Sequence, residues 1–157
     1  MTHHIQSCKI ALVIGQKNSG KTTYLKTVIR KAQHKGLAVG GILSLGHPND
    51  LKKKDYYLCD IQTGREELLA STVAHPRHTI QYGEYQFNPE IFESGNQILK
   101  DSIHSDLIIL DEFGPLELQH AGFYQGFYFL LNHYKGILII SLRPALQLPL
   151  QKIISIS

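Results

Sequence analysis

The residues Gly15-Gln16-Lys17-Asn18-Ser19-Gly20-Lys21-Thr22 follow the pattern G-x-x-x-x-G-K-T, which is typical of a phosphate-binding loop. An apolar, β-branched run precedes them at 10–14 and predicts a buried parallel strand. Apolar residues at helical spacing follow at 23–31. The motif therefore stands between a predicted strand and a predicted helix, which is the context that it needs.

The residue types in this loop suit an anionic ligand. Gly15 and Gly20 let the backbone approach a phosphate group, because neither carries a Cβ. The loop N–H groups and the helix N-terminus together form a concave, positively polarised site. Lys21 is expected to reach the β- and γ-phosphates, and the Thr22 hydroxyl to ligate Mg²⁺. The predicted nucleotide-binding residues are Gly15, Gln16, Lys17, Asn18, Ser19, Gly20, Lys21, Thr22 and Thr23.

A second stretch with residues suited to catalysis or metal binding is 106–112, in which four aliphatic residues are followed by Asp111 and Glu112. This pattern predicts a central strand that delivers two acids to the edge of the sheet where ligands bind. Asp111 is then a candidate Mg²⁺ ligand opposite Thr22, and Glu112 a candidate for orienting or deprotonating a water. An acidic pair after a strand can also simply cap the next element, but the upstream phosphate loop favours the metal role.

Arg143 follows another apolar run, 136–141, and so lies at the same predicted sheet edge. Arginine stabilises transition-state charge in phosphoryl transfer, which makes Arg143 a possible phosphate contact. A surface arginine beside the turn at Pro144 is an equally good interpretation.

The remaining chain reads as alternating strands and helices with one hairpin. Gly36 is a plausible helix-ending glycine, Asn88 and Pro89 predict a helix start, and Thr63-Gly64 a hairpin turn. We expect a turn-rich segment at 45–54 and a loop at 71–83. We expect strands at 8–14, 37–44, 55–61, 66–70, 85–87, 106–112, 136–141 and 153–157, and helices at 20–35, 88–103 and 119–134.

These elements predict an α/β fold: a three-layer P-loop arrangement with a mostly parallel sheet and an added antiparallel hairpin. At 157 residues, with 43% hydrophobic and 18% charged residues, residues 1–157 are expected to form a single nucleotide-binding domain.

The composition also argues against several classes of function. A net charge of +3 with one short lysine run, 52–54, gives little support for nucleic-acid binding. The two cysteines and nine histidines show no zinc spacing, and Cys8 and Cys59 are expected to be small buried hydrophobes in a reducing compartment. Because no signal peptide or membrane-spanning run is visible, we expect a cytoplasmic protein.

Taken together, the chain resembles the small P-loop nucleoside-triphosphatases of the thermostable, cancer-related type, over about residues 8–143. The resemblance rests on the loop at 15–22, a Gly-Gly strand start at 40–41, the hairpin at 55–70, and Gly83-Glu84-Tyr85 before a Pro-Glu helix. Most specific is the run Leu110-Asp111-Glu112-Phe113-Gly114-Pro115-Leu116-Glu117-Leu118, which is similar to the family signature I-D-E-x-G-x-M-E-L.

The resemblance implies Mg²⁺-dependent hydrolysis of the terminal phosphate of ATP, GTP and other nucleoside triphosphates with broad base tolerance. Lys21 and Glu112 are the predicted catalytic residues, and Glu117 matches the second acid of the family signature. The chain departs from the family at 44–47, where an acidic turn is usual, and shows no Asn-Arg pair after its last strand. The base preference therefore stays open.

Two other functions remain as alternatives. The segment 36–47 resembles part of a small GTP-binding adapter family of molybdopterin-cofactor synthesis, which indicates a regulatory nucleotide-binding protein with negligible turnover. A small-molecule kinase would need an acceptor pocket and an arginine-rich lid. The chain has only four arginines, and none are clustered, so this function ranks last.

Overall fold

The computed structural model describes residues 8–50 and 53–156. Its strands form one sheet in the order β1-β8-β7-β2-β3-β4-β6-β5. The first four strands in this order are parallel, and the rest pair antiparallel. The strands are β1 (Lys9–Ile14), β2 (Val39–Asp50), β3 (Lys53–Asp60), β4 (Glu66–Ser71), β5 (Ile80–Tyr82), β6 (Tyr85–Phe87), β7 (Leu107–Phe113) and β8 (Ile137–Leu142).

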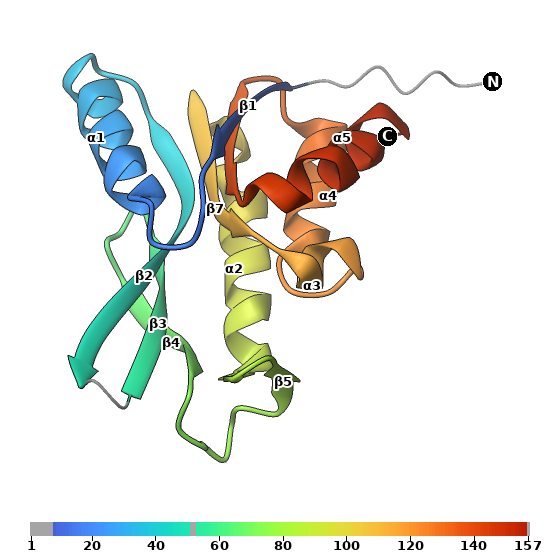
Figure 1. Cartoon of the computed structure of the whole chain (residues 1–157). Coiled ribbons are helices and arrows are strands. Elements are labelled where there is room, and N and C mark those ends of the chain that lie inside the picture. Colours follow the sequence, from blue (N-terminus) through green and yellow to red (C-terminus); the bar gives the residue numbers. More distant parts are fainter. Residues whose placement is uncertain (1–7, 51–52, 157) are drawn as a thin grey trace.

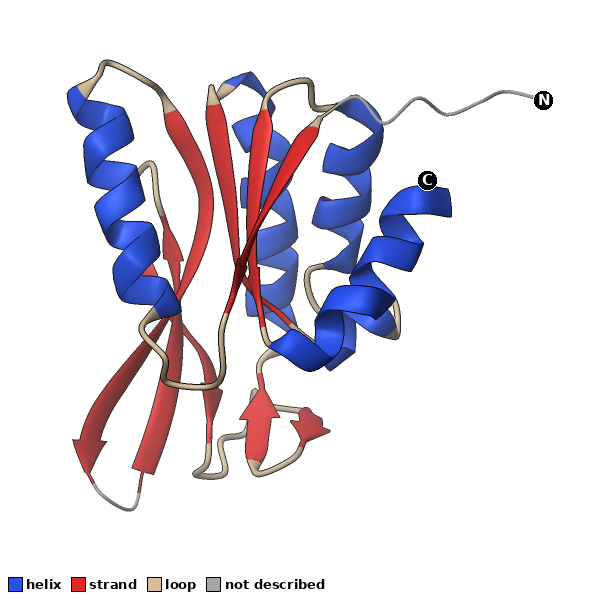
Figure 2. Ribbon diagram, turned by 45° about the horizontal axis from the view of Figure 1, so that its top comes forward, coloured by secondary structure: helices blue, strands red, loops and turns tan. Residues whose placement is uncertain are grey.

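Helices cover both faces of this sheet, so the predicted three-layer α/β fold with an added hairpin is confirmed (Figures 1 and 2). The helix that follows the phosphate loop lies on one face of the sheet, and the later helices pack on the other. The helices are α1 (Lys21–His34), α2 (Pro89–Asp101), α3 (Pro115–Leu118), α4 (Tyr124–His133) and α5 (Gln147–Ile156), with short 3₁₀ turns at Ser102–His104 and Pro144–Leu146.

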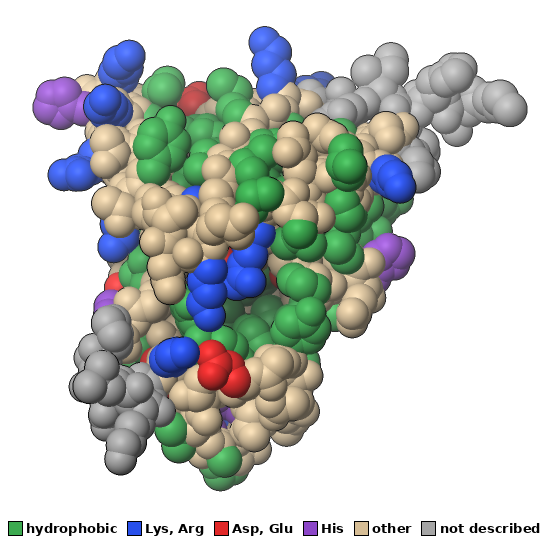
Figure 3. Space-filling view, viewed as in Figure 1, with side chains coloured by type: hydrophobic (Ala, Val, Ile, Leu, Met, Phe, Trp, Pro, Cys, Tyr) green, Lys and Arg blue, Asp and Glu red, His purple; other side chains and the backbone are tan. Residues whose placement is uncertain are grey.

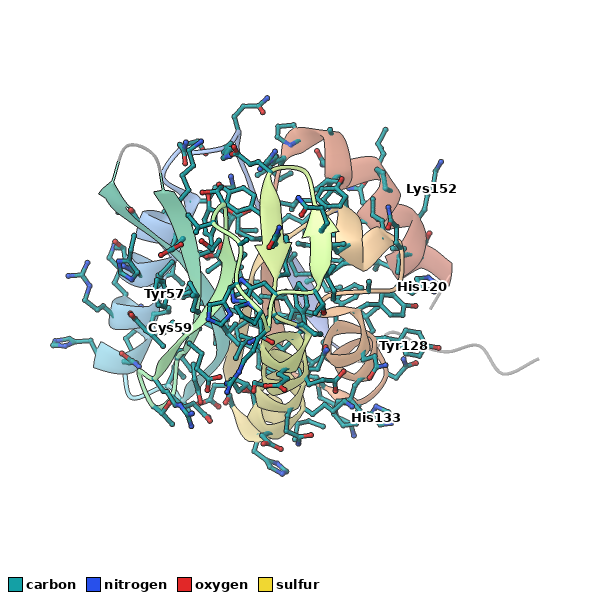
Figure 4. All side chains as sticks on the ribbon, turned by 90° about the horizontal axis from the view of Figure 1, so that it is seen from below. Tyr57, Cys59, His120, Tyr128, His133 and Lys152 are labelled. Carbon is teal, nitrogen blue, oxygen red and sulfur yellow. The ribbon has the colours of Figure 1, made fainter. Side chains whose placement is uncertain are left out.

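Each face of the sheet has its own hydrophobic core. Leu25 and Ile29 of α1 pack on Leu43 and Ile109, and Tyr57 and Cys59 border this smaller core. Figure 4 shows both of these β3 side chains on the α1 side of the sheet. The larger core lies on the opposite face, where α2, α4 and α5 bury Leu99, Phe127 and Leu150.

The predicted helix ends and the predicted hairpin turn are present in the structure. The Asn88 side chain accepts a hydrogen bond from the Glu90 N–H, 3.0 Å away, and so caps the start of α2. Gly36 follows the end of α1 with φ 80°, a left-handed conformation that glycine adopts without strain. The hairpin is also confirmed, because β3 pairs antiparallel with β4 and Gly64 lies in their turn with φ 74°.

The structure corrects two predictions near the phosphate loop. The run 10–14 forms a parallel strand, but β1 lies at the sheet edge and is only partly buried. The segment 45–54 is not mainly a turn: β2 continues to Asp50 and β3 begins at Lys53, leaving 51–52 outside the described residues. Pairing of Leu45 with Tyr57 and Gly46 with Tyr56 sustains this extension, which a bulge interrupts after His47.

Three predictions further along the chain are also wrong. The helix expected at 119–134 begins only at Tyr124, as α4, because His120 and Gly122 take φ near 60°. The residues before this turn form the separate short helix α3. The loop expected at 71–83 contains β5, which pairs with β6. The strand expected at 153–157 lies instead within α5 up to Ile156, since Pro149 occupies the first helical turn, where it is tolerated.

Gly41 marks the closest approach between β2 and β7. Its φ is 100°, and a Cβ at this position would clash with the backbone carbonyl of Ile109. Because backbone cannot move aside as a flexible side chain does, Gly41→Ala should lower the free energy of unfolding by about 2–4 kcal/mol in urea denaturation. Gly46→Ala is the matched control on the same strand, since its nearest neighbour is 3.5 Å away, and it should change stability by less than about 0.5 kcal/mol. Equal losses would contradict this account of Gly41.

Candidate active site

The candidate residues converge because parallel strands present their carboxyl ends at one edge of the sheet. The phosphate loop follows β1, and Arg143 follows β8. Asp111 and Glu112 lie near the end of β7, and Ser44 lies in β2 just past its pairing with β7. A Gly15 N–H donation to Leu142 O, 3.2 Å away, ties the beginning of the loop to β8.

A bulge in β7 determines the orientation of the two acidic residues, Asp111 and Glu112. Leu110 pairs with Ile140 and Phe113 with Leu142, so Asp111 and Glu112 together stand opposite Ser141. Glu112 adopts φ 63°, an uncommon conformation for a side chain of this size. The Ser141 hydroxyl donates to Asp111 Oδ1 and accepts the Glu112 N–H at 2.8 Å. One buried hydroxyl therefore holds both members of the acidic pair in place.

Asp111 accepts hydrogen bonds from three elements besides its own strand. Its Oδ2 accepts from Thr22 Oγ1 at 2.8 Å and from the Ser44 N–H at 3.1 Å. The carboxyl is almost fully buried, and burial raises its pKa above the usual range. The hydrogen bonds from Ser141, Ser44 and Thr22 and the charge of Lys21 act against this rise.

Lys21 is buried against the phosphate loop. Its ammonium group donates to the carbonyl oxygens of Gly15 and Gln16, both at 2.8 Å. These contacts place the charge beneath the loop and close to both acids, whose pKa values it lowers. The ammonium group has three N–H donors, and the two carbonyl oxygens of the loop accept from it.

Glu112 is the less constrained of the two acids. Burial raises its pKa, and the negative charge of Asp111 raises it further. Lys21, Arg143 and Lys17 act in the opposite direction. A carboxyl with a raised pKa beside a cationic loop has the properties expected of a general base.

These residues border a cavity of about 460 Å³, here called the phosphate cavity. Its lining includes the loop from Lys17 to Thr23, the β2 segment 44–47, Glu112 and Arg143. Arg143 is exposed and lines the cavity, so the structure places it at the rim rather than in the hydrogen-bonded centre. Gly15 and Gln16 contribute the carbonyl groups that hold Lys21.

Sequence reasoning missed Ser44 and Ser141, which both hold Asp111. A signal was present, because Ser141 is the lone hydroxyl residue in the aliphatic strand Ile137–Leu142, and Ser44 closes a similar aliphatic run. A polar residue in a buried strand needs a partner. The nature of that partner depends on which strands are neighbours, and the sequence does not state this.

The donor atoms available here fit a hard divalent cation. Thr22 offers a hydroxyl oxygen and Asp111 a carboxylate oxygen, 2.8 Å apart. Mg²⁺ prefers oxygen ligands, and it often takes few of them from the protein because phosphate and water supply the rest. Within the described residues no group of three or more His, Cys, Asp or Glu side chains could hold a metal ion, so this pair is the strongest candidate.

A G-K-T loop between strand and helix, facing a buried acid on a nearby parallel strand, defines a P-loop nucleotide-binding protein. A family model described as NTPase matches residues 10–155. The chain therefore belongs to this NTPase family, and it is an enzyme of the nucleoside-triphosphate phosphohydrolase class.

Individual relatives agree with this assignment. The nucleoside-triphosphatase THEP1 of Methanosarcina barkeri is 28% identical over 131 residues, which span 82% of this chain and 73% of the relative. The THEP1 of Archaeoglobus fulgidus is 32% identical over 113 residues, or 71% of this chain and 64% of the relative.

Two solved structures share the fold. The crystal structure of THEP1 from Aquifex aeolicus matches with a TM-score of 0.69 at 19% identity, over 92% of this chain and 83% of that one. The solution structure of a human cancer-related nucleoside triphosphatase matches with a TM-score of 0.70 at 18% identity, over 92% of this chain and 84% of that one.

None of the helices in the described ranges has the length and apolarity needed to cross a membrane.

Glu117, the second acid of the 110–118 signature, is buried behind the site. Its two carboxyl oxygens accept the Gly114 N–H at 2.9 Å and the Phe123 N–H at 3.1 Å. Burial nevertheless raises its pKa to about 7, and these hydrogen bonds only partly oppose the rise. The carboxyl joins the beginning of α3 to the residue before α4.

This raised pKa has a consequence for stability. Between pH 4.5 and about 7 the native carboxyl of Glu117 holds a proton that the unfolded chain has lost, so stability falls as pH rises through this window. Relative to Glu117→Gln, which does not titrate, the wild type should lose up to about 3 kcal/mol of unfolding free energy across it. Urea denaturation at several pH values measures the difference. Parallel pH profiles for the two proteins would show that Glu117 does not titrate in this range.

Proposed function

We propose that the protein hydrolyses the terminal phosphate of nucleoside triphosphates in a Mg²⁺-dependent reaction. The observation that supports this best is the contact between Thr22 Oγ1 and Asp111 Oδ2, with Glu112 beside it at the cavity wall. It joins the phosphate loop to the acidic strand in the arrangement that phosphoryl transfer requires.

In this mechanism the loop binds and orients the triphosphate. The N–H groups of the loop and of the first turn of α1, including Thr23, face the phosphate oxygens. Lys21 exchanges its carbonyl partners, Gly15 and Gln16, for β- and γ-phosphate oxygens. Arg143 at the rim is placed to contact the terminal phosphate and to stabilise charge that develops there.

Glu112 supplies the base. It orients a water at the terminal phosphate and accepts its proton, which the raised pKa of the carboxyl favours. The bulge and the Ser141 contact fix the backbone from which Glu112 projects, so the base is held without a large entropic cost at the moment of reaction.

The proposed metal is held by Thr22 and Asp111. Bound Mg²⁺ would neutralise charge on the β- and γ-phosphates and help to orient them. Asp111 suits this role because its burial disfavours an isolated negative charge, which a cation would compensate.

The nucleotide is ATP or GTP, and we propose a broad base tolerance, because the phosphate cavity is lined mainly by residues that would address phosphates. We further propose that residues 1–157 act as one nucleotide-binding domain, that the protein works in the cytoplasm, and that nucleic acid is not a ligand. A protein partner is compatible with this proposal, and its chemistry remains open.

Substitutions of Lys21 and Glu112 test the proposal. Lys21→Ala should reduce Mg²⁺-dependent phosphate release from ATP or GTP by about 10²–10³-fold, because it removes a charge from the transition state. Glu112→Gln should reduce turnover by about 10²–10⁴-fold while nucleotide binding is retained, because only the base is lost. Phosphate release assays and titration with a fluorescent nucleotide separate the two effects.

Matched controls are available on exposed helix surfaces. Lys152→Ala on α5 and Glu90→Gln on α2 change the same charges away from the phosphate cavity, and they should leave turnover unchanged. Figure 4 labels Lys152 on the outer side of α5. Tight nucleotide binding with turnover at background level in the wild type would contradict hydrolysis and favour the regulatory adapter.

Removal of divalent cations tests the metal role. EDTA should abolish phosphate release, and Mg²⁺ should restore it in a saturable manner. Thr22→Val, which keeps the shape of the side chain but lacks the hydroxyl, should raise the Mg²⁺ concentration needed for half-maximal rate. Turnover that survives EDTA, or an unchanged Mg²⁺ requirement in Thr22→Val, would argue against this ligand pair.

A further inference from the structure

A second cavity, of about 310 Å³, adjoins the phosphate cavity and is here called the aromatic cavity. Its volume lies at the lower end of the range for small-molecule sites. Much of its wall is apolar and comes from β4, β5, β6, α2 and the segment that contains α3. The aromatic residues that line it are Tyr56, Tyr82, Tyr85, Phe87, Phe92 and Phe123.

The two cavities meet at the catalytic acid. Both cavities are lined by Lys17, Ser44, Tyr56, Glu112 and Arg143, so the two are neighbours at this point. Figure 3 shows the hollow on this face of the molecule, with hydrophobic side chains inside and Lys, Arg and acidic side chains at its rim. A molecule in the aromatic cavity would thus lie next to Glu112 and to the phosphate cavity.

The distribution of polarity in the aromatic cavity is uneven. Charged groups gather at the junction, where Lys17 and Arg143 flank Glu112, and Lys17 Nζ lies 5.7 Å from the centre of the Tyr85 ring. Most of the remaining wall is formed by rings and aliphatic side chains, including Leu69 and Leu116, and Glu84 and Glu117 also border it. This suits a ligand with an apolar body and one polar end directed at Glu112.

The wall is also preformed. Phe92 and Phe123 are 6% and 5% exposed and pack edge to face, with ring centres 5.0 Å apart. Glu117 ties the Gly114 and Phe123 backbones together, and all three residues line the cavity. A rigid apolar wall of this kind is not needed to admit a water molecule, but it does lower the entropic cost of binding a second substrate.

We propose that the aromatic cavity binds a small aromatic alcohol or phenol as a phosphoryl acceptor, so that the protein transfers the terminal phosphate as well as hydrolysing the nucleotide. This inference rests on the proposed function, because it uses the same bound triphosphate and the same base. It meets one requirement of the kinase alternative, the acceptor pocket, which the sequence did not reveal.

The transfer step is balanced without another reactant. The acceptor hydroxyl oxygen forms a bond to the γ-phosphorus, and the bond between that phosphorus and the β,γ-bridging oxygen breaks. Glu112 accepts the hydroxyl proton and later releases it to solvent. The products are the phosphate monoester of the alcohol and the nucleoside diphosphate, and Lys17 and Arg143 flank the position of the new monoester.

The experiment compares two probes that share the same phenylethyl group. The first is 2-phenylethanol, which carries a hydroxyl, and the second is its methyl ether, which cannot accept a phosphoryl group. Binding of each to the wild type is measured by saturation-transfer NMR without nucleotide, and transfer from γ-labelled ATP is followed together with phosphate release. We expect both probes to bind and only 2-phenylethanol to become phosphorylated.

Tyr82→Ala tests the location. Tyr82 lines the aromatic cavity but not the phosphate cavity, and it is 41% exposed, so its truncation spares the core. It should raise the Kd for both probes by about three- to tenfold, which is the loss expected for one aromatic contact. Tyr128→Ala, a truncation of a 48% exposed tyrosine on the outer side of α4 (Figure 4), should leave probe binding unchanged. Glu112→Gln should bind 2-phenylethanol and fail to phosphorylate it.

The outcomes separate this inference from the proposed function. If ATP is hydrolysed but 2-phenylethanol either does not bind or is not phosphorylated, the proposal of a phosphoryl acceptor is overturned and the proposed hydrolase function stands. Binding of both probes without transfer would identify an apolar docking pocket, for example for a side chain of a protein partner, and would also overturn it. If Tyr82→Ala and Tyr128→Ala change the Kd of the probes equally, the probes bind outside the aromatic cavity and the proposal is overturned. Loss of all nucleotide turnover in the wild type would instead refute the proposed function.

Discussion

The candidate site depends on the pairing of the β7 bulge with Ser141. Two acids stand opposite one serine, whose hydroxyl donates to the Asp111 carboxyl and accepts the Glu112 N–H. Without the bulge, successive side chains would alternate between the two faces of the sheet, and the acids would point in opposite directions. With the bulge, Glu112 lies on the wall of the phosphate cavity and Asp111 contacts Thr22, another residue of that wall, at the cost of an uncommon backbone conformation at Glu112.

The order of strands explains why this serine is available. β8 lies between β1, which leads into the phosphate loop, and β7, which carries the acids. The loop must therefore reach across β8 to bring Thr22 within 2.8 Å of Asp111. The same order leaves the antiparallel strands β3, β4, β6 and β5 to extend the sheet beyond β2, where their aromatic residues form a wall facing Glu112. The proposed hydrolysis and the proposed acceptor thus share one carboxylate, that of Glu112.

Sequence reasoning succeeded where the signal was local. The phosphate loop, the aliphatic strand that ends in two acids, the Asn88 cap and the Gly64 turn each depend on a few adjacent residues, and the structure has all four features. It failed where a distant partner decided the outcome. Pairing with β3 extends β2 through a segment rich in turn-forming residues. Helix α5 replaces an expected strand because its apolar residues pack on the larger core, with Leu150 fully buried.

The sequence alone determined three things: the presence of a phosphate loop, the α/β class, and the candidate residues Lys21, Thr22, Asp111 and Glu112. Each of these is encoded by the spacing of residues within a short stretch. The tertiary structure alone decided the edge position of β1, the supporting roles of Ser44 and Ser141, and the aromatic cavity beside Glu112. These features arise from contacts between residues that are distant in the chain, such as Ser44 and Asp111, which are 67 positions apart. Such contacts exist only after the strands have taken their order.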